Sequence, residues 1–304
     1  MFSVLTKKEK KEKKEPITLD NPEDILGFGL IEFNIVKTMK KEERHSIGFN
    51  HENELLYAID FPLVSNEEAW LAKQVLNEFR KKTDSEKKNF PARNCLDGFL
   101  EENLLSISKQ QKEYLIELIE LNAFRNGLMQ FLLDDNALEE IALIGTGKEK
   151  PVHVFHRIFG WMKTNLFYSN EMEAINLINK LARKTGRQVS FQKPQINAVL
   201  ENGNRLNACI SPVAFSGASI TIRKFSQKPF TPIDLIKGKT CSAELISFLE
   251  FAMKTDLSLL VCGNTGSGKT SFLNAIFLFV PKNERIIIIE ETPEINCVIG
   301  RNSS

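Results

Sequence analysis

Apolar positions recur at helical spacing in three parts of the chain. Residues 65–79, 109–133 and 171–183 each place apolar side chains three and four positions apart, which predicts a helix in each. Ser65 stands at the start of the first helix and Ser169 stands just before the third. Each serine is therefore a candidate to cap the first amides of its helix.

Shorter segments with alternating side chains follow residue 136 and predict strands. Asn202-Gly203 stands between two of these segments and predicts a hairpin, because both residues tolerate a positive φ. Residues 17–64 have a mixed pattern that predicts only small strands. The patterns together predict an α+β domain with an antiparallel sheet. The predicted strands are Ala142–Ile144, Val152–Phe155, Gln188–Phe191, Ala198–Leu200, Leu206–Ile210 and Ser219–Arg223.

Charge and proline content suggest how the chain is divided. Residues 81–91 are charged and contain a proline, which predicts a surface loop. Lys7–Glu15 carries six lysines against three glutamates, so it is either a solvated lead-in helix or a segment drawn to acidic lipids or to a partner. The resulting parts are a charged tail at 1–16, a mixed helical region at 17–105, an α+β domain at 106–227, a linker at 228–239 and the start of a second domain at 240–304.

Composition excludes several classes of protein. Lys and Arg number 40 against 39 Asp and Glu, which excludes a protein that coats nucleic acid by charge alone. Apolar runs are far shorter than the ~18 residues of a membrane-spanning helix. The five cysteines lie far apart, so neither a disulfide framework nor a structural zinc site fits. His153 and His156 fall on opposite faces of a strand and cannot share a metal ion. We expect a cytoplasmic globular protein with Trp161 in its core.

The segment Gly263-Asn-Thr-Gly-Ser-Gly-Lys-Thr270 matches the phosphate-binding P-loop pattern. It follows the apolar segment Leu257–Cys262, which predicts a strand, and it opens an apolar helix. Lys269 would reach the β- and γ-phosphates of ATP, and the Thr270 hydroxyl would bind Mg²⁺. The predicted nucleotide-binding residues are Gly263, Asn264, Thr265, Gly266, Ser267, Gly268, Lys269, Thr270 and Ser271.

Carboxylates follow the next predicted strand, Arg285–Ile289. Glu290, Glu291 and Glu294 stand at its carboxyl end, where Mg²⁺ and an attacking water are bound beside a P-loop strand. We predict Glu290 and Glu294, with Thr270, as metal ligands, and Lys269, Glu290 and Glu291 as catalytic residues. Two other interpretations are a strand that ends in solvent and a Walker B strand in which glutamate replaces aspartate.

From Asp134 to Asn296 the sequence resembles the secretion ATPases, the motors of type II and type IV secretion systems, type IV pili and archaella. The resemblance is strongest to the archaeal branch, through residues 151–165. Residues 194–205 and 219–225 are also similar to that family. The run Ile289–Ile295 is similar to the family's Asp box, although Glu291 stands where aspartate is common. Asn197 and Asn202 likewise stand where the family often has aspartate.

The resemblance implies an α/β fold in which an α+β N-terminal domain is hinged to a RecA-like P-loop domain, with ATP and Mg²⁺ in the cleft between them. It implies that Arg205 and Arg223 reach the nucleotide phosphates. Alternation along Ser219–Arg223 agrees, because it separates Arg223 from two buried isoleucines, while Lys224 faces the other side. It also implies a homo-hexamer at the inner face of the cell membrane. Its partner there would be a polytopic membrane platform protein. A role with nucleic acid is not expected, because the net charge is only +1 and the sequence has no basic patch with interleaved aromatic residues.

The family's Walker B motif and His box would follow Asn296, so the resemblance implies an incomplete RecA-like domain. Three hypotheses stand: a truncated product, half of a motor completed by a second chain, and trans-splicing at Cys297, which resembles the first residue of an intein. The resemblance implies the ATP-binding part of a motor that couples ATP hydrolysis to protein export or filament assembly. We expect this chain alone to turn over negligibly. The alternative is a non-catalytic adaptor that docks on the membrane platform.

Overall fold

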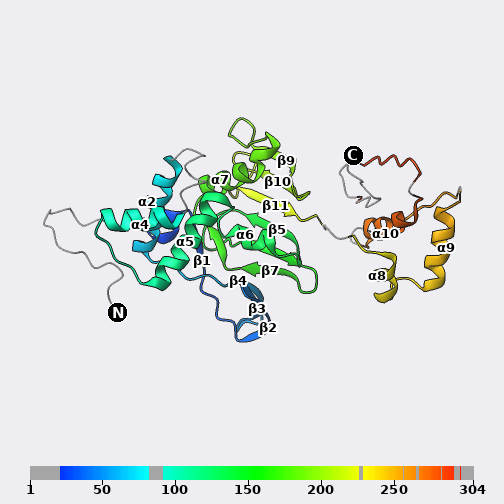
Figure 1. The fold of residues 1–304 in the computed structure, drawn as a ribbon, viewed down its shortest axis with the longest axis horizontal. Helices are drawn as coiled ribbons and strands as arrows, with labels where there is room; N and C mark the ends of the chain where they lie inside the picture. Colours follow the sequence, from blue (N-terminus) through cyan, green and yellow to red (C-terminus); the bar gives the residue numbers. More distant parts are fainter. Residues whose placement is uncertain are drawn as a thin grey trace. The chain divides into compact units, whose positions relative to one another are not determined.

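The computed structural model describes residues 21–81, 92–225, 229–255, 257–264, 267–281, 283–290 and 295 (Figure 1). The predicted tail at 1–16 and most of the predicted loop at 81–91 lie outside these residues. The chain divides into two compact units, unit 1 at Met1–Lys224 and unit 2 at Phe225–Ser304. Each unit is described by itself.

Among the residues that the structure describes, unit 1 contains a nine-stranded sheet in the order β2-β3-β4-β7-β6-β5-β11-β10-β9 and a separate pair, β1-β8. Neighbouring strands are antiparallel except β4 and β7, which are parallel. Residues 17–105 and 106–227 thus contribute strands to one sheet. The strands are β1 (Phe28–Leu30), β2 (Lys37–Lys41), β3 (His45–Phe49), β4 (Leu55–Ile59), β5 (Leu138–Ile144), β6 (His153–His156), β7 (Gly160–Thr164), β8 (Leu166–Tyr168), β9 (Gln195–Val199), β10 (Arg205–Cys209) and β11 (Ser219–Arg223).

Helices bury one face of this sheet in a single core. In β11, Ile220 and Ile222 are buried while Thr221 and Arg223 are not, which confirms the predicted alternation. The buried face of α7 belongs to the same core, and α2, α4 and α5 lie together beside the sheet (Figure 1). The helices of unit 1 are α1 (Pro22–Leu26), α2 (Asn66–Lys81), α4 (Ala92–Glu102), α5 (Lys109–Phe124), α6 (Met129–Asp134), α7 (Glu171–Ala182) and the short η1 (Arg183–Thr185).

Two of the predicted local signals are confirmed. The Ser65 hydroxyl accepts from the Glu68 amide at 3.3 Å, and the Glu68 carboxylate accepts from the Ser65 amide at 2.9 Å, so Ser65 caps α2. Gly203 has a φ of 83° between β9 and β10, which pair antiparallel as the hairpin signal predicts.

The predicted helix at 109–133 is wrong as one element, because the structure has two helices there. α5 ends at Phe124 and α6 begins at Met129. Gly127 lies between them with a φ of 60°, a left-handed conformation that interrupts a helix. The sequence patterns also gave no helix at α4, although five of its residues are buried.

Two smaller predictions are also wrong. Gln188–Phe191 is not a strand, because Ser190 and Lys193 form an isolated bridge across a turn that reverses the chain. The cap of α7 is Asn170 rather than Ser169. The Asn170 side chain accepts from the Glu173 amide at 3.0 Å, since Asn170 is the residue that directly precedes the helix.

Trp161 was expected in the core, but its side chain is 52% exposed. It lies on β7 with its ring against Phe155, at 5.5 Å between ring centroids. Period-two alternation explains this position, because the neighbouring Met162 takes the buried face of β7.

Unit 2 contains α8 (Pro232–Lys237), α9 (Ala243–Met253), α10 (Lys269–Ile276) and the short η2 (Phe277–Phe279). α8 falls inside the predicted linker at 228–239. Thr231 and Asp234 form a capping box there, and Pro232 occupies the first turn, where its missing amide costs no hydrogen bond. The buried residues of the unit's small core are Leu235, Ile246, Leu249, Ala275 and Ile276.

The strands predicted at Leu257–Cys262 and Arg285–Ile289 do not form in the structure. Leu260 is 86% exposed and Ile289 is 92% exposed. A parallel strand is stable only when neighbouring strands satisfy its backbone and helices cover both faces. The described residues of unit 2 contain neither neighbouring strands nor helices on both sides of these segments. The two apolar segments therefore form no strand pairing there.

A buried amide provides a test of how unit 1 is held together. The Asn165 side chain accepts from the Ile59 amide at 2.8 Å and donates to the Ile59 carbonyl at 3.0 Å. We predict that Asn165→Ala lowers the free energy of unfolding by about 2–4 kcal/mol, because two buried backbone groups lose their partner. Asn176→Ala is the control, since that amide is exposed and bonds only Glu173 among the described residues. Urea unfolding followed by circular dichroism measures both, and an equal effect of the two changes would contradict the role of Asn165.

Candidate functional site

The P-loop turns back on itself directly before α10. The Ser267 amide donates to the Asn264 carbonyl at 3.2 Å, and Gly268 has a φ of 85°. A Cβ atom on Gly263 would lie 2.7 Å from the Ser267 hydroxyl. The left-handed backbone at Gly268 therefore favours glycine, whereas a side chain at Gly263 would require the Ser267 hydroxyl to move. Thr265 and Gly266 lie outside the described residues.

Lys269 is the first residue of α10, and its side chain folds over the loop. Its Nζ donates to the Asn264 carbonyl at 2.6 Å. The loop, the ammonium group and the helix N-terminus thus come together within a few residues. Helix N-termini and curled loops favour anions, because backbone N–H groups and the helix dipole present positive charge. These residues fit the phosphates of a nucleotide.

Of the carboxylates predicted beside the P-loop, the structure describes Glu290. Its Oε1 accepts from the Ile295 amide at 2.9 Å. Glu291 and Glu294 lie outside the described residues.

Arg205 and Arg223 lie directly opposite each other on β10 and β11. Glu140 on β5 is the next residue in the same register row, and its Oε2 accepts from the Arg223 Nε at 3.2 Å. We call Arg205, Arg223 and Glu140 the arginine row. Side chains opposite each other in a sheet share a face, so two guanidinium groups and one carboxylate gather on the open face of unit 1. The row carries a net positive charge suited to phosphate.

An amide pair lies beside the arginine row. Asn197, Asn207 and Thr221 form the adjacent register row, and the Asn207 side chain donates to the Asn197 side-chain oxygen at 2.5 Å. Asn197 therefore presents a neutral side chain on the open face. The secretion ATPases that the sequence resembles often have aspartate at this position.

Lys224 points away from this face, as the strand alternation predicts. Its Nζ donates to the carbonyl oxygens of Leu132 and Asp135 near the end of α6. Burial lowers the pKa of Lys224, while the nearby Asp135 opposes that shift. Lys224 therefore ties the end of β11 to α6 and does not join the arginine row.

A buried polar cluster in unit 1 was not found from the sequence. The His45 ring stacks on the Tyr57 ring at 4.6 Å, and the Tyr57 hydroxyl donates to Asp135 Oδ2 at 2.9 Å. His45 Nε2 lies 3.7 Å from the same Asp135 oxygen and carries no hydrogen bond to the described residues. Burial lowers the pKa of His45 and of the nearby His156. The cluster joins β3, β4 and the residue that follows α6, so only the tertiary fold brings it together.

The part of the chain that the structure describes holds no group of three or more His, Cys, Asp or Glu placed to bind a metal ion. His156 is buried and His153 is only partly buried, since they occupy opposite faces of β6. None of the helices in the described ranges is long and apolar enough to cross a membrane.

Comparison with known proteins relates one segment of the chain to a protein family. Residues 176–299 match the family model described as type II/IV secretion system protein, and this segment includes Arg205, Arg223 and the P-loop. The matched segment belongs to the type II/IV secretion system protein family. An uncharacterized protein of Methanocaldococcus jannaschii is 33% identical over 195 residues, which are 64% of this chain and 35% of that protein.

Named type IV secretion system proteins are similar at lower identity. The type IV secretion system protein VirB11 of Bartonella quintana is 28% identical over 198 residues, covering 54% of each chain. This chain thus spans about a third of the archaeal relative and about half of VirB11. A crystal structure of the VirB11 ATPase from the Brucella suis type IV secretion system, in complex with sulphate, is 24% identical over 55% of this chain and 56% of that one. Its TM-score of 0.31 is too low to support an argument about the fold.

The buried histidines predict how the stability of unit 1 depends on pH. Burial lowers the pKa of His45 and His156 in the folded chain below the ordinary value of 6.5, so the unfolded chain binds protons first as pH falls. We predict that the free energy of unfolding is highest above pH 6.5 and decreases toward pH 5, by up to about 1.4 kcal/mol per pH unit for each histidine. Urea unfolding at a series of pH values measures this slope.

The double change His45→Gln and His156→Gln should flatten that slope between pH 7 and pH 5. His51→Gln is the control, because it removes a histidine from an exposed turn outside the cluster. A double variant that keeps the slope of the unchanged chain would show that the pH dependence arises elsewhere.

Proposed function

We propose that the chain is the nucleotide-binding part of a secretion-type motor ATPase, which couples ATP hydrolysis to protein export or to assembly of a pilus or archaellum filament. One observation carries the proposal. Within the segment of the secretion family match, the P-loop curls onto the first residue of α10 and Lys269 folds over it. The proposal includes a RecA-like arrangement for unit 2.

Lys269 is the residue that exchanges partners when ATP binds. Its ammonium group gives up the Asn264 carbonyl for the β- and γ-phosphate oxygens, which carry more negative charge. Backbone amides of the loop and of the first turn of α10 hold the phosphates from the other side. Glycine at Gly268 allows the left-handed turn that leads into α10, which other residues adopt only with strain.

Mg²⁺ would be held by Thr270, Glu290 and Glu294, with Glu291 directing the attacking water. Oxygen ligands of this kind suit Mg²⁺, which usually binds through one or two carboxylates and the substrate phosphates. The metal supplies charge neutralisation on the phosphate oxygens.

Arg205 and Arg223 supply positive charge from the N-terminal unit. In the described residues Arg223 is held by Glu140, so its guanidinium is restrained on the open face of the sheet. A phosphate group competes with Glu140 for this guanidinium and can be bound by two parallel hydrogen bonds.

The match to the secretion family also supports a proposal about the assembly, location and partner of this motor. We propose a hexamer at the inner face of the cell membrane that acts on a polytopic platform protein of a secretion, pilus or archaellum machine. The VirB11 proteins are named as parts of type IV secretion systems. If the chain is instead a non-catalytic adaptor, its function does not depend on Lys269.

The P-loop lysine gives the first test. We predict that Lys269→Ala weakens binding of a fluorescent ATP analogue with Mg²⁺ by at least about tenfold, because one charge-assisted hydrogen bond is worth about 1.5–3 kcal/mol. Lys254→Ala is the matched control, since Lys254 lies in the same unit and pairs only with Glu250 at the surface among the described residues. Fluorescence titration measures both, and equal affinities for the two variants would contradict the proposal.

The arginine row gives a second test, with a control from the other side of β5. Arg223 pairs with Glu140 and Arg157 pairs with Glu139, at 3.2 Å and 3.1 Å. We predict that Arg223→Gln weakens binding of the ATP analogue by about three- to tenfold, as expected for one lost contact to phosphate. Arg157→Gln should leave the affinity unchanged. Equal losses in both variants would mean that only general surface charge matters.

A further inference from the structure

The arginine row continues across the open face of unit 1 into a pair of aromatic side chains. Phe155 on β6 lies opposite Glu140 on β5, and Trp161 on β7 lies opposite Phe155. Residues that are opposite each other in a sheet share a face, so both aromatic side chains lie on the face that carries the arginines. The complete row, over five neighbouring strands, is Trp161, Phe155, Glu140, Arg223 and Arg205.

We call Trp161 and Phe155 the aromatic pair. Their rings meet nearly edge to face, at 5.5 Å between centroids and 67° between ring planes, and Trp161 is 52% exposed. The contact with Phe155 restrains the indole while about half of its surface stays open to solvent. A restrained and exposed indole is suited to stack on a planar group, because little side-chain freedom is lost on binding.

A carboxylate separates the aromatic pair from the two arginines. Glu140 Oε2 accepts from the Arg223 Nε at 3.2 Å, and no hydrogen bond joins Glu140 Oε1 to the described residues. The Glu140 side chain is 23% exposed. A carboxylate is an acceptor of hydrogen bonds, and acidic side chains bind the hydroxyl groups of ribose in this way. Glu140 gains further capacity to accept when phosphate takes the Arg223 guanidinium.

The order of these groups along the row matches the order of groups in a nucleotide. The row has an aromatic surface, then a carboxylate, then two guanidinium groups, and a nucleotide has a base, then a ribose, then phosphates. Neighbouring strands lie about 4.8 Å apart, so about 10 Å of sheet separates Phe155 from Arg223. An extended nucleotide covers such a span between its base and its phosphates.

We propose that the aromatic pair stacks on the base of the nucleotide and that Glu140 accepts a hydrogen bond from the ribose 2′-hydroxyl. The arginine side chains of the row bind the phosphates. This inference rests on the proposed function and extends it, because it assigns the base and the ribose to side chains of unit 1. Tripolyphosphate, which has neither a base nor a ribose, then has contacts with the arginines alone on this face.

The emission of Trp161 tests the stacking directly. The chain has two tryptophans, and Trp70 packs against Phe99 at 6.1 Å between ring centroids, so Trp70→Phe leaves Trp161 as the reporter. Mg-ATP should quench the emission of this variant, because a stacked base quenches an indole, whereas tripolyphosphate with Mg²⁺ should leave it unchanged. The Trp161→Phe chain, which keeps only Trp70, should respond to neither ligand.

Equilibrium dialysis with radiolabelled ATP in the same samples separates this inference from the proposed function. Bound ATP that leaves the Trp161 emission unchanged would overturn the inference alone, and it would be the result expected if the aromatic pair binds a protein partner instead. A chain that binds neither ATP nor tripolyphosphate would overturn the inference and the proposed function together.

Affinities measured by calorimetry locate the contact with the base. Trp161→Ala should weaken binding of ATP about tenfold and binding of tripolyphosphate less than about twofold, because stacking on one base is lost. Phe215→Ala is the matched control, since Phe215 is an aromatic side chain of unit 1 outside the row and is 99% exposed. It should change neither affinity. Equal losses for the two ligands in Trp161→Ala would mean that the substitution only disturbs the unit, and would overturn the inference.

A comparison of ATP with 2′-deoxy-ATP tests Glu140. ATP should bind about three- to tenfold more tightly, and Glu140→Ala should bring the ratio of the two affinities to about one, because the hydrogen bond to the 2′-hydroxyl is lost. The ratio cancels any effect of the substitution on Arg223, which acts on both nucleotides alike. Glu139→Ala is the control, since the Glu139 carboxylate pairs with Arg157, and it should keep the ratio of the unchanged chain. A ratio that survives in Glu140→Ala would overturn the role of Glu140.

Discussion

Pairing of β5 with strands on both of its sides is the interaction on which the rest of unit 1 depends. β5 binds β6 along one edge and β11 along the other, so it joins the strands from the first part of the chain to the later hairpin of β9 and β10. Glu140 on its open face holds Arg223, while Asp135, in the short connection that leads from α6 into β5, accepts from Tyr57. The strand and the connection before it thus carry contacts of both the arginine row and the buried histidine cluster.

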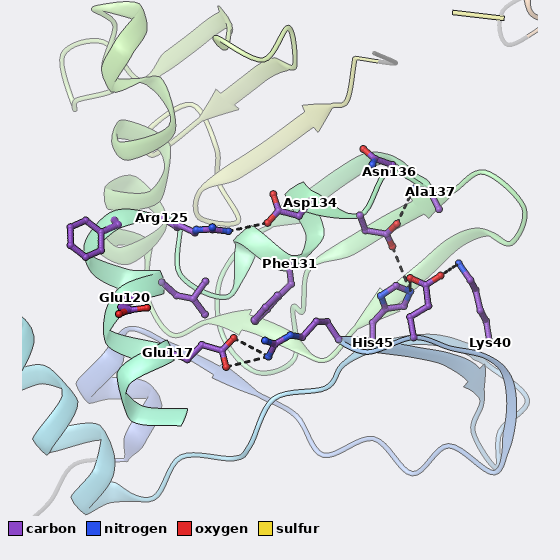
Figure 2. Close-up of a pocket in the computed structure, with 14 residues that line it drawn as sticks. Lys40, His45, Glu117, Glu120, Arg125, Phe131, Asp134, Asn136 and Ala137 are labelled. Carbon is purple, nitrogen blue, oxygen red and sulfur yellow. Dashed lines mark hydrogen bonds and ion pairs between the residues drawn. The ribbon is translucent and has the colours of Figure 1, made fainter. Parts of the chain in front are cut away.

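Two surfaces of unit 1 have opposite charge. The arginine row gathers positive charge on the open face of the sheet, whereas a groove between the β2–β3 hairpin and α5 keeps an excess of carboxylates (Figure 2). The net charge of the whole chain is only +1, so neither surface could be recognised from composition.

In the described residues of unit 2, the P-loop turn forms although no sheet is present. The P-loop needs only short-range contacts, since its turn, its glycines and the start of α10 lie within a few residues. The apolar segments on either side depend on distant partners, and in the described residues they stay unpaired, with Ile289 92% exposed. The position of Arg223 opposite Arg205 and Glu140 likewise depends on the pairing of distant strands.

The sequence by itself determined the features that arise from neighbouring residues: the P-loop, the cap at Ser65, the hairpin at Asn202-Gly203 and the alternation that exposes Arg223. Its resemblance to secretion ATPases also agrees with the family match. Only the tertiary structure decided the order of the nine strands and the break in the helix before α6. It also placed Glu140 against Arg223 and His45 against Asp135. These contacts join residues separated by 83 and 90 positions, and sequence periodicity carries no information about which distant strands become neighbours.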